Sequence, residues 1–265
     1  MNLLQTIKKA KEEQRTCFVT YTTAGDPDIN TSLKILETLS KNGSDIIELG
    51  IPFSDPISDG PTIQKASERA LANNVTISTA LDLIKKFRKK YATPIILFGY
   101  YNPFLRYGLD KIMKDIRTSG AEGILIVDLP PEESYEAQRA ANKAGIELIY
   151  LIAPTSTEKR IKVISELSNS FIYVVSVTGV TGARKMLDKN LKSFIKNIKE
   201  RTKKPICVGF GISQPSHVNE LKNITDGIVI GSAIIKQIER NLKKKSSIIK
   251  EITNFMVKIK KSTFF

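Results

Sequence analysis

The chain of 265 residues contains no tryptophan, a single histidine, His217, and only two cysteines, Cys17 and Cys207. Two cysteines without a CxxC spacing cannot form a disulfide framework, and both lie in apolar runs, so we expect buried core thiols. No Cys, His or carboxylate cluster has metal-ligand spacing, and His217 is interpreted as a surface residue at the start of a helix. A chain this long needs neither a disulfide nor a metal to fold.

Long apolar segments are also missing. No stretch approaches the roughly 18 residues of a membrane span, and the first sixteen residues lack the continuous apolar core of a signal peptide. Those residues predict a short amphipathic helix in front of the first strand. We therefore expect no membrane partner, and a location in a bacterial cytoplasm or, for a plastid-encoded chain, in the plastid stroma.

Charge is abundant and unbalanced, with a formal net charge of +14. From Lys236 to Phe265 nine basic residues face only two acidic ones, so this tail carries half of the surplus. A nucleic-acid surface is one interpretation, and a solvated helix face is the other. Aromatic residues do not alternate with the lysines in a base-stacking pattern, so we favour the helix face and expect no nucleic acid partner.

Eight short apolar runs alternate with amphipathic stretches along the chain. Continuous rather than alternating hydrophobicity is typical of parallel strands that are buried on both faces. Eight repeats predict a single (β/α)8 barrel over residues 1–265, with the N-terminal helix as an addition. An open doubly wound sheet is the alternative, but its GxGxxG turn is absent after the first run. The runs are 17–23, 45–50, 94–100, 123–128, 147–153, 171–177, 205–211 and 227–233.

The stretches between the runs are expected to be helices. Gly120 and Gly145 stand where C-terminal caps belong, and 154–158 offers an N-cap followed by an acidic residue. The longest interruptions, 50–76 and 176–190, follow the second and sixth strands and predict extended loops on the face where barrels carry their active sites. The clearest helical stretches are 30–41, 77–90, 109–119, 133–143, 157–167 and 191–201.

Two carboxyl groups are candidates for acid–base chemistry. Glu48 lies inside an apolar run near the end of the second strand, where burial would raise its pKa toward neutrality. Pairing with a lysine of a neighbouring strand is the structural alternative. The loop that follows holds three prolines, which restrict it, and Asp59, a second carboxylate able to reach over the barrel mouth. Asp55 in the same loop is either functional or a loop cap.

Glycine-containing turns at three successive strand ends suggest an anion site. Gly209 and Gly211 close the seventh strand, Gly231 and Ser232 lie between the eighth strand and a helix, and 179–182 follows the sixth. Such turns let backbone N–H groups approach a phosphate. Asp128, after the fourth strand, is interpreted as catalytic, a loop anchor or a partner contact.

Several motifs together resemble the tryptophan synthase α chains. The most specific is IELGIPFSDPISDGPTIQ at 47–64, and the resemblance covers essentially the whole chain. The sequence looks closer to cyanobacterial and plastid forms than to the enteric type. The other motifs are GDPD (25–28), GYYNP (99–103), VDLPPEES (127–134), APTST (153–157), VTGVTGAR (177–184), GFGIS (209–213) and GSAI (231–234).

The resemblance implies cleavage of indole-3-glycerol phosphate into indole and glyceraldehyde 3-phosphate. It implies Glu48 as general acid/base, Asp59 as the carboxylate facing the indole N–H, and Tyr173 as a supporting residue. Thr181 matches the mobile lid, and the phosphate cup matches Gly182, Gly211, Gly231 and Ser232. The apolar walls match Tyr21, Phe98, Tyr100, Leu125, Val127, Ile152 and Phe210.

The resemblance also implies a tryptophan synthase β chain as partner, in an α2β2 tetramer, contacted by Pro52 and Asp55. It implies no cofactor in this chain, because pyridoxal phosphate belongs to the β partner. Two enzymatic or binding alternatives remain open at this point. One is another phosphate-binding barrel enzyme, although the strand cores lack a catalytic lysine. The other is a non-catalytic barrel that only activates a β-type partner, which retention of Glu48 and Asp59 argues against.

Overall fold

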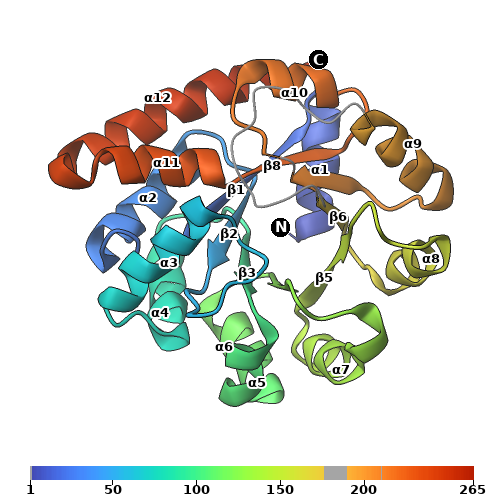
Figure 1. The fold of residues 1–265 in the computed structure, drawn as a ribbon, viewed down its shortest axis with the longest axis horizontal. Coiled ribbons are helices and arrows are strands. Elements are labelled where there is room, and N and C mark those ends of the chain that lie inside the picture. Colours follow the sequence, from blue (N-terminus) through green and yellow to red (C-terminus); the bar gives the residue numbers. More distant parts are fainter. Residues whose placement is uncertain (1, 176–189, 210) are drawn as a thin grey trace.

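The computed structural model describes residues 2–175, 190–209 and 211–265. Within those residues, eight parallel strands close into one barrel in sequence order, and helices surround it (Figure 1). The predicted (β/α)8 architecture is therefore confirmed. The strands are β1 (Cys17–Thr23), β2 (Ile46–Gly50), β3 (Ile95–Gly99), β4 (Gly123–Ile126), β5 (Glu147–Ile152), β6 (Ile172–Val175), β7 (Ile206–Gly209) and β8 (Gly227–Ile230).

The helices begin and end where local chemistry favours it. Thr157 caps the helix that starts at Glu158, and Gly120 and Gly145 end their helices in the left-handed conformation, as predicted. The elements are α1 (Leu3–Glu12), α2 (Ile29–Lys41), α3 (Pro61–Ala72), α4 (Ile77–Arg88), α5 (Tyr101–Tyr107), α6 (Leu109–Ser119), η1 (Pro131–Glu133), α7 (Tyr135–Ala144), α8 (Glu158–Leu167), α9 (Leu191–Arg201), α10 (Pro215–Leu221), α11 (Ser232–Arg240), η2 (Leu242–Lys244) and α12 (Ser246–Ser262).

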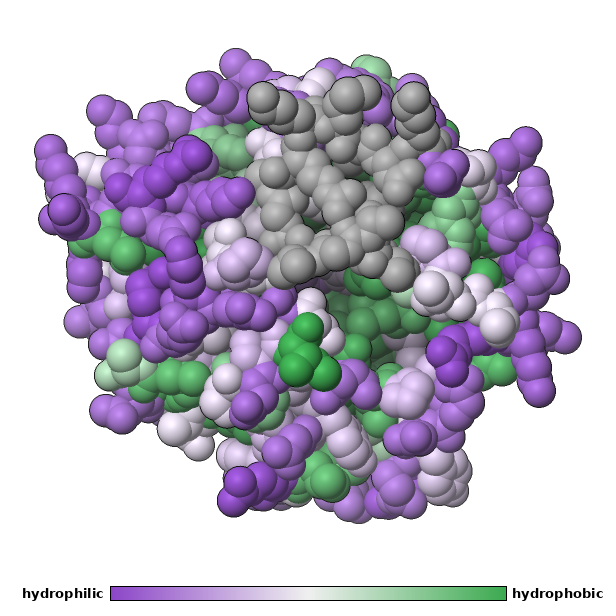
Figure 2. Space-filling model, in the orientation of Figure 1, coloured by the Kyte–Doolittle hydropathy of each residue, from purple (hydrophilic) through white to green (hydrophobic). Residues whose placement is uncertain are grey.

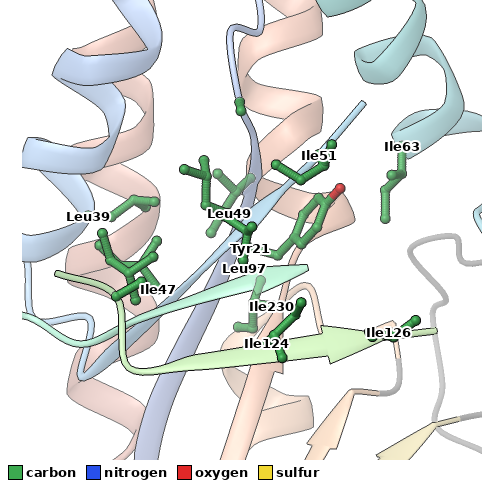
Figure 3. Close-up of a cluster of buried hydrophobic side chains, with 14 of the residues drawn as sticks. Tyr21, Leu39, Ile47, Leu49, Ile51, Ile63, Leu97, Ile124, Ile126 and Ile230 are labelled. Carbon is green, nitrogen blue, oxygen red and sulfur yellow. The ribbon is translucent and has the colours of Figure 1, made fainter. Parts of the chain in front are cut away.

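Two apolar clusters hold the barrel together. The larger one lies mainly between the strands and the helices, and Figure 3 shows part of it, including Leu39 of α2 and Ile63 of α3. The smaller one fills the barrel interior, where Leu3 and Ile7 of α1 join side chains such as Leu125. The predicted N-terminal helix thus becomes part of the barrel core. Cys17 and Cys207 are free and buried in this interior cluster, as expected.

Two sequence-based expectations need correction. The segment 50–76 is not one loop, because α3 occupies Pro61–Ala72, with Pro61 at a position that suits a helix start. His217 is not a surface residue, since only 1% of it is exposed and it faces the core together with Val218 and Leu221. The loop after β6 lies outside the described residues.

The basic tail comprises the end of α11, η2 and α12, and the apolar side of α12 packs on the helices α2, α10 and α11. Ile248, Ile252 and Met256 are fully buried, while Lys243, Lys244 and Lys250 are exposed. This arrangement agrees with the expected solvated helix face. None of the helices in the described part of the chain combines the length and apolarity needed to cross a membrane.

Candidate active site

Glu48 is positioned by strand register inside the barrel. It pairs with Tyr21 of β1 on one side and Ile96 of β3 on the other. Its side chain is fully buried, and neither carboxyl oxygen has a hydrogen-bond partner among the described residues. Burial alone raises its pKa to about 8, as predicted in direction. Pairing with a lysine of a neighbouring strand is therefore excluded within the described residues.

Asp59 lies in the loop between β2 and α3 and is only 8% exposed. The Tyr100 hydroxyl donates to its Oδ2 at 3.1 Å, and the Ser58 N–H donates to that hydroxyl at 3.0 Å. Burial raises the pKa of Asp59 to about 6, and the Tyr100 hydrogen bond counteracts part of this rise. The Phe53 ring packs 5.2 Å from the Tyr100 ring, measured between centroids. The proline-rich loop therefore folds its carboxylate inward.

Two tyrosines reach the same region because the neighbouring strands end in glycine. A Cβ on Gly50 would stand 2.2 Å from the Tyr21 hydroxyl, and a Cβ on Gly209 would stand 2.5 Å from the Tyr173 hydroxyl. Burial raises the pKa of Tyr173 well above its usual value, and the nearby charge of Glu48 adds to the rise. Both phenols therefore stay protonated close to the catalytic carboxyl candidates.

Several of the candidate wall residues lie in or against the apolar cluster of the barrel interior. Leu125 belongs to the interior cluster, and Phe98 and Val127 pack against it. Phe98 also meets Tyr21 edge to face, with ring centroids 5.1 Å apart. Figure 2 shows a hollow lined with hydrophobic atoms on this face of the molecule, with more hydrophilic atoms along its right side.

Ile152 has a different environment from Leu125, Phe98 and Val127. It is fully buried and belongs to the larger cluster that includes the helix layer, whereas its neighbour Leu151 packs against the interior cluster. Because side chains alternate along a strand, Leu151 is the residue of this pair on the interior side. A wall role for Ile152 stays a prediction, and Phe210 lies outside the described residues.

The candidate phosphate end is formed by the start of α11 and the turn after β7. Gly231 precedes α11, and a Cβ on it would lie 3.1 Å from the Tyr21 Cβ, so this helix end adjoins the barrel mouth. Helix geometry leaves the N–H groups of Ser232 and Ala233 without a partner inside the helix. Gly211 has a φ of +67°, which glycine adopts without strain. Thr181 and Gly182 lie outside the described residues.

The side chains of the β2–α3 loop differ widely in their exposure to solvent. Pro52 is buried, whereas Asp55 is exposed and hydrogen-bonded by the Ser54 hydroxyl. Ile57 is 86% exposed, an unusual position for a large apolar residue and one that the sequence pattern did not identify. Nearby, Asp128 accepts a hydrogen bond from the Tyr101 N–H at 2.7 Å and so serves as a loop anchor.

These features define a class of protein: a (β/α)8 barrel with two buried carboxyl groups of raised pKa at the strand ends of its mouth. No group of three or more His, Cys, Asp or Glu side chains in the described residues is arranged to hold a metal ion. The model of one family, described as the tryptophan synthase alpha chain, matches residues 7–264. The chain belongs to this family of lyases in tryptophan biosynthesis.

Individual relatives agree with the family match. The tryptophan synthase alpha chain of Geotalea daltonii is 46% identical over 89% of each chain. That of a Thermoanaerobacter species is 44% identical over 94% of this chain and 95% of its own length. A crystal structure of the alpha chain from Legionella pneumophila has a TM-score of 0.91 at 34% identity, covering 99% of this chain and 97% of that one. These relatives are bacterial and give the plastid option no support.

Proposed function

We propose that the chain cleaves indole-3-glycerol phosphate by a retro-aldol reaction, with Glu48 as the general acid/base. The buried, unpartnered carboxyl of Glu48 carries this proposal. Because its pKa is about 8, Glu48 is mostly protonated at neutral pH and can deliver a proton to C3 of the indole ring. The resulting carboxylate then takes the proton of the side-chain hydroxyl as the carbon–carbon bond breaks. The products are indole and glyceraldehyde 3-phosphate.

Asp59 supplies the fixed negative charge in this proposal. With a pKa of about 6 it is mostly ionised at neutral pH, unlike Glu48. Protonation at C3 places positive charge on the ring nitrogen, and an anion held in advance beside the ring N–H stabilises that charge. Tyr100, which hydrogen-bonds Asp59, keeps the carboxylate in place. Two carboxyl groups in different environments thus take different roles.

Binding of the substrate is assigned to the surrounding side chains and backbone. The phosphate would be held by Gly182, Gly211, Gly231 and Ser232, with support from the start of α11. Tyr173 would support Glu48, and Thr181 would belong to a lid that excludes water. The indole would be walled by Tyr21, Phe98, Tyr100, Leu125, Val127, Ile152 and Phe210.

Membership of the family implies a β-chain partner. We propose that the partner contacts the β2–α3 loop, with Asp55 and Ile57 as direct contacts and the buried Pro52 shaping the loop. An exposed isoleucine beside a carboxylate is typical of a protein interface that combines apolar and charged contacts. An α2β2 assembly, pyridoxal phosphate confined to the partner, and the compartment all stay predictions. So does the expectation that this chain binds neither nucleic acid nor a membrane.

The decisive experiment is indole release from indole-3-glycerol phosphate by the purified chain, with and without a tryptophan synthase β chain. Slow release that the β chain accelerates is the expected result. Glu48→Gln should abolish release without loss of fold, because the carboxamide has nearly the same shape but cannot exchange the proton. Near-wild-type release by a folded Glu48→Gln protein would contradict the mechanism. No release by the folded wild type would contradict the function.

A further inference from the structure

The backbone of Asp59 is hydrogen-bonded by a side chain of the helix that follows it. The side-chain amide of Gln64, in α3, donates a hydrogen bond to the Asp59 carbonyl oxygen at 2.9 Å. A longer contact of 3.5 Å joins the same amide to the Pro56 carbonyl oxygen, which also accepts the Asp59 N–H at 3.0 Å. One side chain therefore ties together both ends of the short turn that carries the carboxylate.

The other end of α3 is anchored to the loop after β1. Arg69 donates two hydrogen bonds to Asp26, from Nε at 2.7 Å and from a terminal nitrogen at 2.9 Å. Asp26 is fully buried and the Arg69 side chain is only 20% exposed. One turn further on, Asn73 donates to the Pro27 carbonyl oxygen at 2.9 Å. A two-pronged pair of this kind fixes both distance and orientation, and breaking it leaves a buried charge unpaired.

The surroundings of this anchor connect it to the rest of the mouth. α3 packs beside β1 and α11 (Figure 1). Lys65 of α3 also forms an ion pair with Glu239 of α11 at 3.5 Å. α11 begins at Ser232, the candidate phosphate end, and β1 carries Tyr21. A shift of α3 would therefore move Asp59 relative to the elements that hold the rest of the site.

We propose that Gln64, Arg69 and Asp26 are positioning residues for Asp59. Gln64 fixes the Asp59 backbone by a hydrogen bond, and the buried Arg69–Asp26 pair holds the helix that carries Gln64. None of the three is a catalytic residue, since each acts through Asp59. The inference rests on the proposed function, in which Asp59 stabilises charge on the substrate ring. Catalysis is sensitive to such placement, because a displacement of about 1 Å can cost on the order of a hundredfold in rate.

The first test is Gln64→Met, which keeps the length of the side chain and removes its donors. We expect kcat for indole release to fall about tenfold while KM changes less than about twofold, because substrate contacts stay in place. In a plot of kcat against pH, the acid limb is the fall at low pH that we assign to protonation of Asp59. This acid limb should also move to lower pH. A loosened Asp59 gains water, which relieves the burial that raises its pKa. The nearby titratable groups Tyr100, Tyr21, Tyr173 and Glu48 are unchanged.

The second test separates positioning from stability by means of a matched pair. Arg88 makes two hydrogen bonds to Glu122, at 2.9 and 2.7 Å, and joins α4 to the start of β4, at the end of the barrel opposite the mouth. Arg69→Lys loses the two-pronged pairing with Asp26. Arg88→Lys loses the bonds to Glu122, which both come from one terminal nitrogen, and the bonds of the other guanidinium nitrogens to the Gly120 and Thr93 carbonyl oxygens. Both substitutions should therefore lower the free energy of unfolding. Only Arg69→Lys should lower kcat and shift the acid limb.

The kcat values and pH profiles of the three variants distinguish a positioning role from a general loss of stability. A lowered kcat with a shifted acid limb in Gln64→Met and Arg69→Lys, and neither change in Arg88→Lys, supports the inference. A Gln64→Met enzyme with wild-type kcat and an unmoved acid limb overturns it, as does an equal loss of kcat in the two arginine variants. Wild-type protein measured in the same assay identifies the separate case in which the lyase proposal itself fails, because then no variant can be compared.

Discussion

The Glu48→Gln substitution should stabilise the fold, and the more so the higher the pH. Burial raises the pKa of Glu48 from 4.5 to about 8, so the folded chain keeps a proton that the unfolded chain releases above pH 4.5. The free energy of unfolding of the wild type therefore falls as the pH rises from 4.5 to about 8, and the loss is complete above that range. Glutamine is neutral at every pH and escapes this loss.

The magnitude follows from the two pKa values. Linkage gives a destabilisation by Glu48 of about 1 kcal/mol at pH 5, about 3 kcal/mol at pH 7 and about 5 kcal/mol at pH 9. The side chain is fully buried, so solvent does not screen the effect. The variant's advantage in the free energy of unfolding should therefore grow by about 4 kcal/mol between pH 5 and pH 9.

Urea unfolding of both proteins at the same three pH values measures this advantage directly. Effects of pH on the other titratable groups are common to both proteins and cancel in the difference. Glu12→Gln on α1, where the carboxyl is exposed, is the control and should follow the wild type throughout. Parallel wild-type and Glu48→Gln curves would refute the reasoning, because they would mean that Glu48 releases its proton equally easily in both states.

Three further substitutions probe the rest of the site. Tyr100→Phe removes the hydrogen bond that lowers the pKa of Asp59, so this pKa should rise above about 6 and the acid limb of kcat should move to higher pH in a pH–rate profile. Gly211→Ala puts a side chain at a φ of +67°, which costs about 1 kcal/mol. It should weaken binding of inorganic phosphate, measured by calorimetry. Ile57→Asp removes the exposed apolar side chain, so the β chain should accelerate indole release less than it does for the wild type; equal acceleration would place the interface elsewhere.

Much of the barrel was predictable because its strands are buried on both faces. Such strands appear in the sequence as continuous apolar runs, and each matching strand begins or ends within a few residues of its run. The helix α3 escaped prediction because the prolines and aspartates in front of it suggested a long loop. Pro61 in fact stands in the first turn, where a helix has no use for the missing N–H.

The sequence alone identified some of the functional residues and missed others. Glu48 stood out because a carboxyl inside an apolar run has few explanations. His217 was misjudged because its burial depends on how α10 packs, which the local sequence of a short polar helix does not reveal. Asp26 and Arg69 were not found because they are 43 residues apart in the chain, and each one alone is typical of a solvated surface residue.

The different surroundings of Glu48 and Asp59 explain why the stability cost is tolerated. Asp59 has a hydroxyl donor, and its pKa of about 6 leaves it ionised at neutral pH, whereas Glu48 has no partner in the described residues and its pKa is about 8. A lysine beside Glu48 would lower that pKa and stabilise the fold. It would also leave Glu48 ionised, without the proton that the indole ring receives in the proposed mechanism. The absence of a hydrogen-bond partner in the described residues therefore keeps Glu48 protonated at neutral pH, as the proposed acid role requires, at the expense of stability.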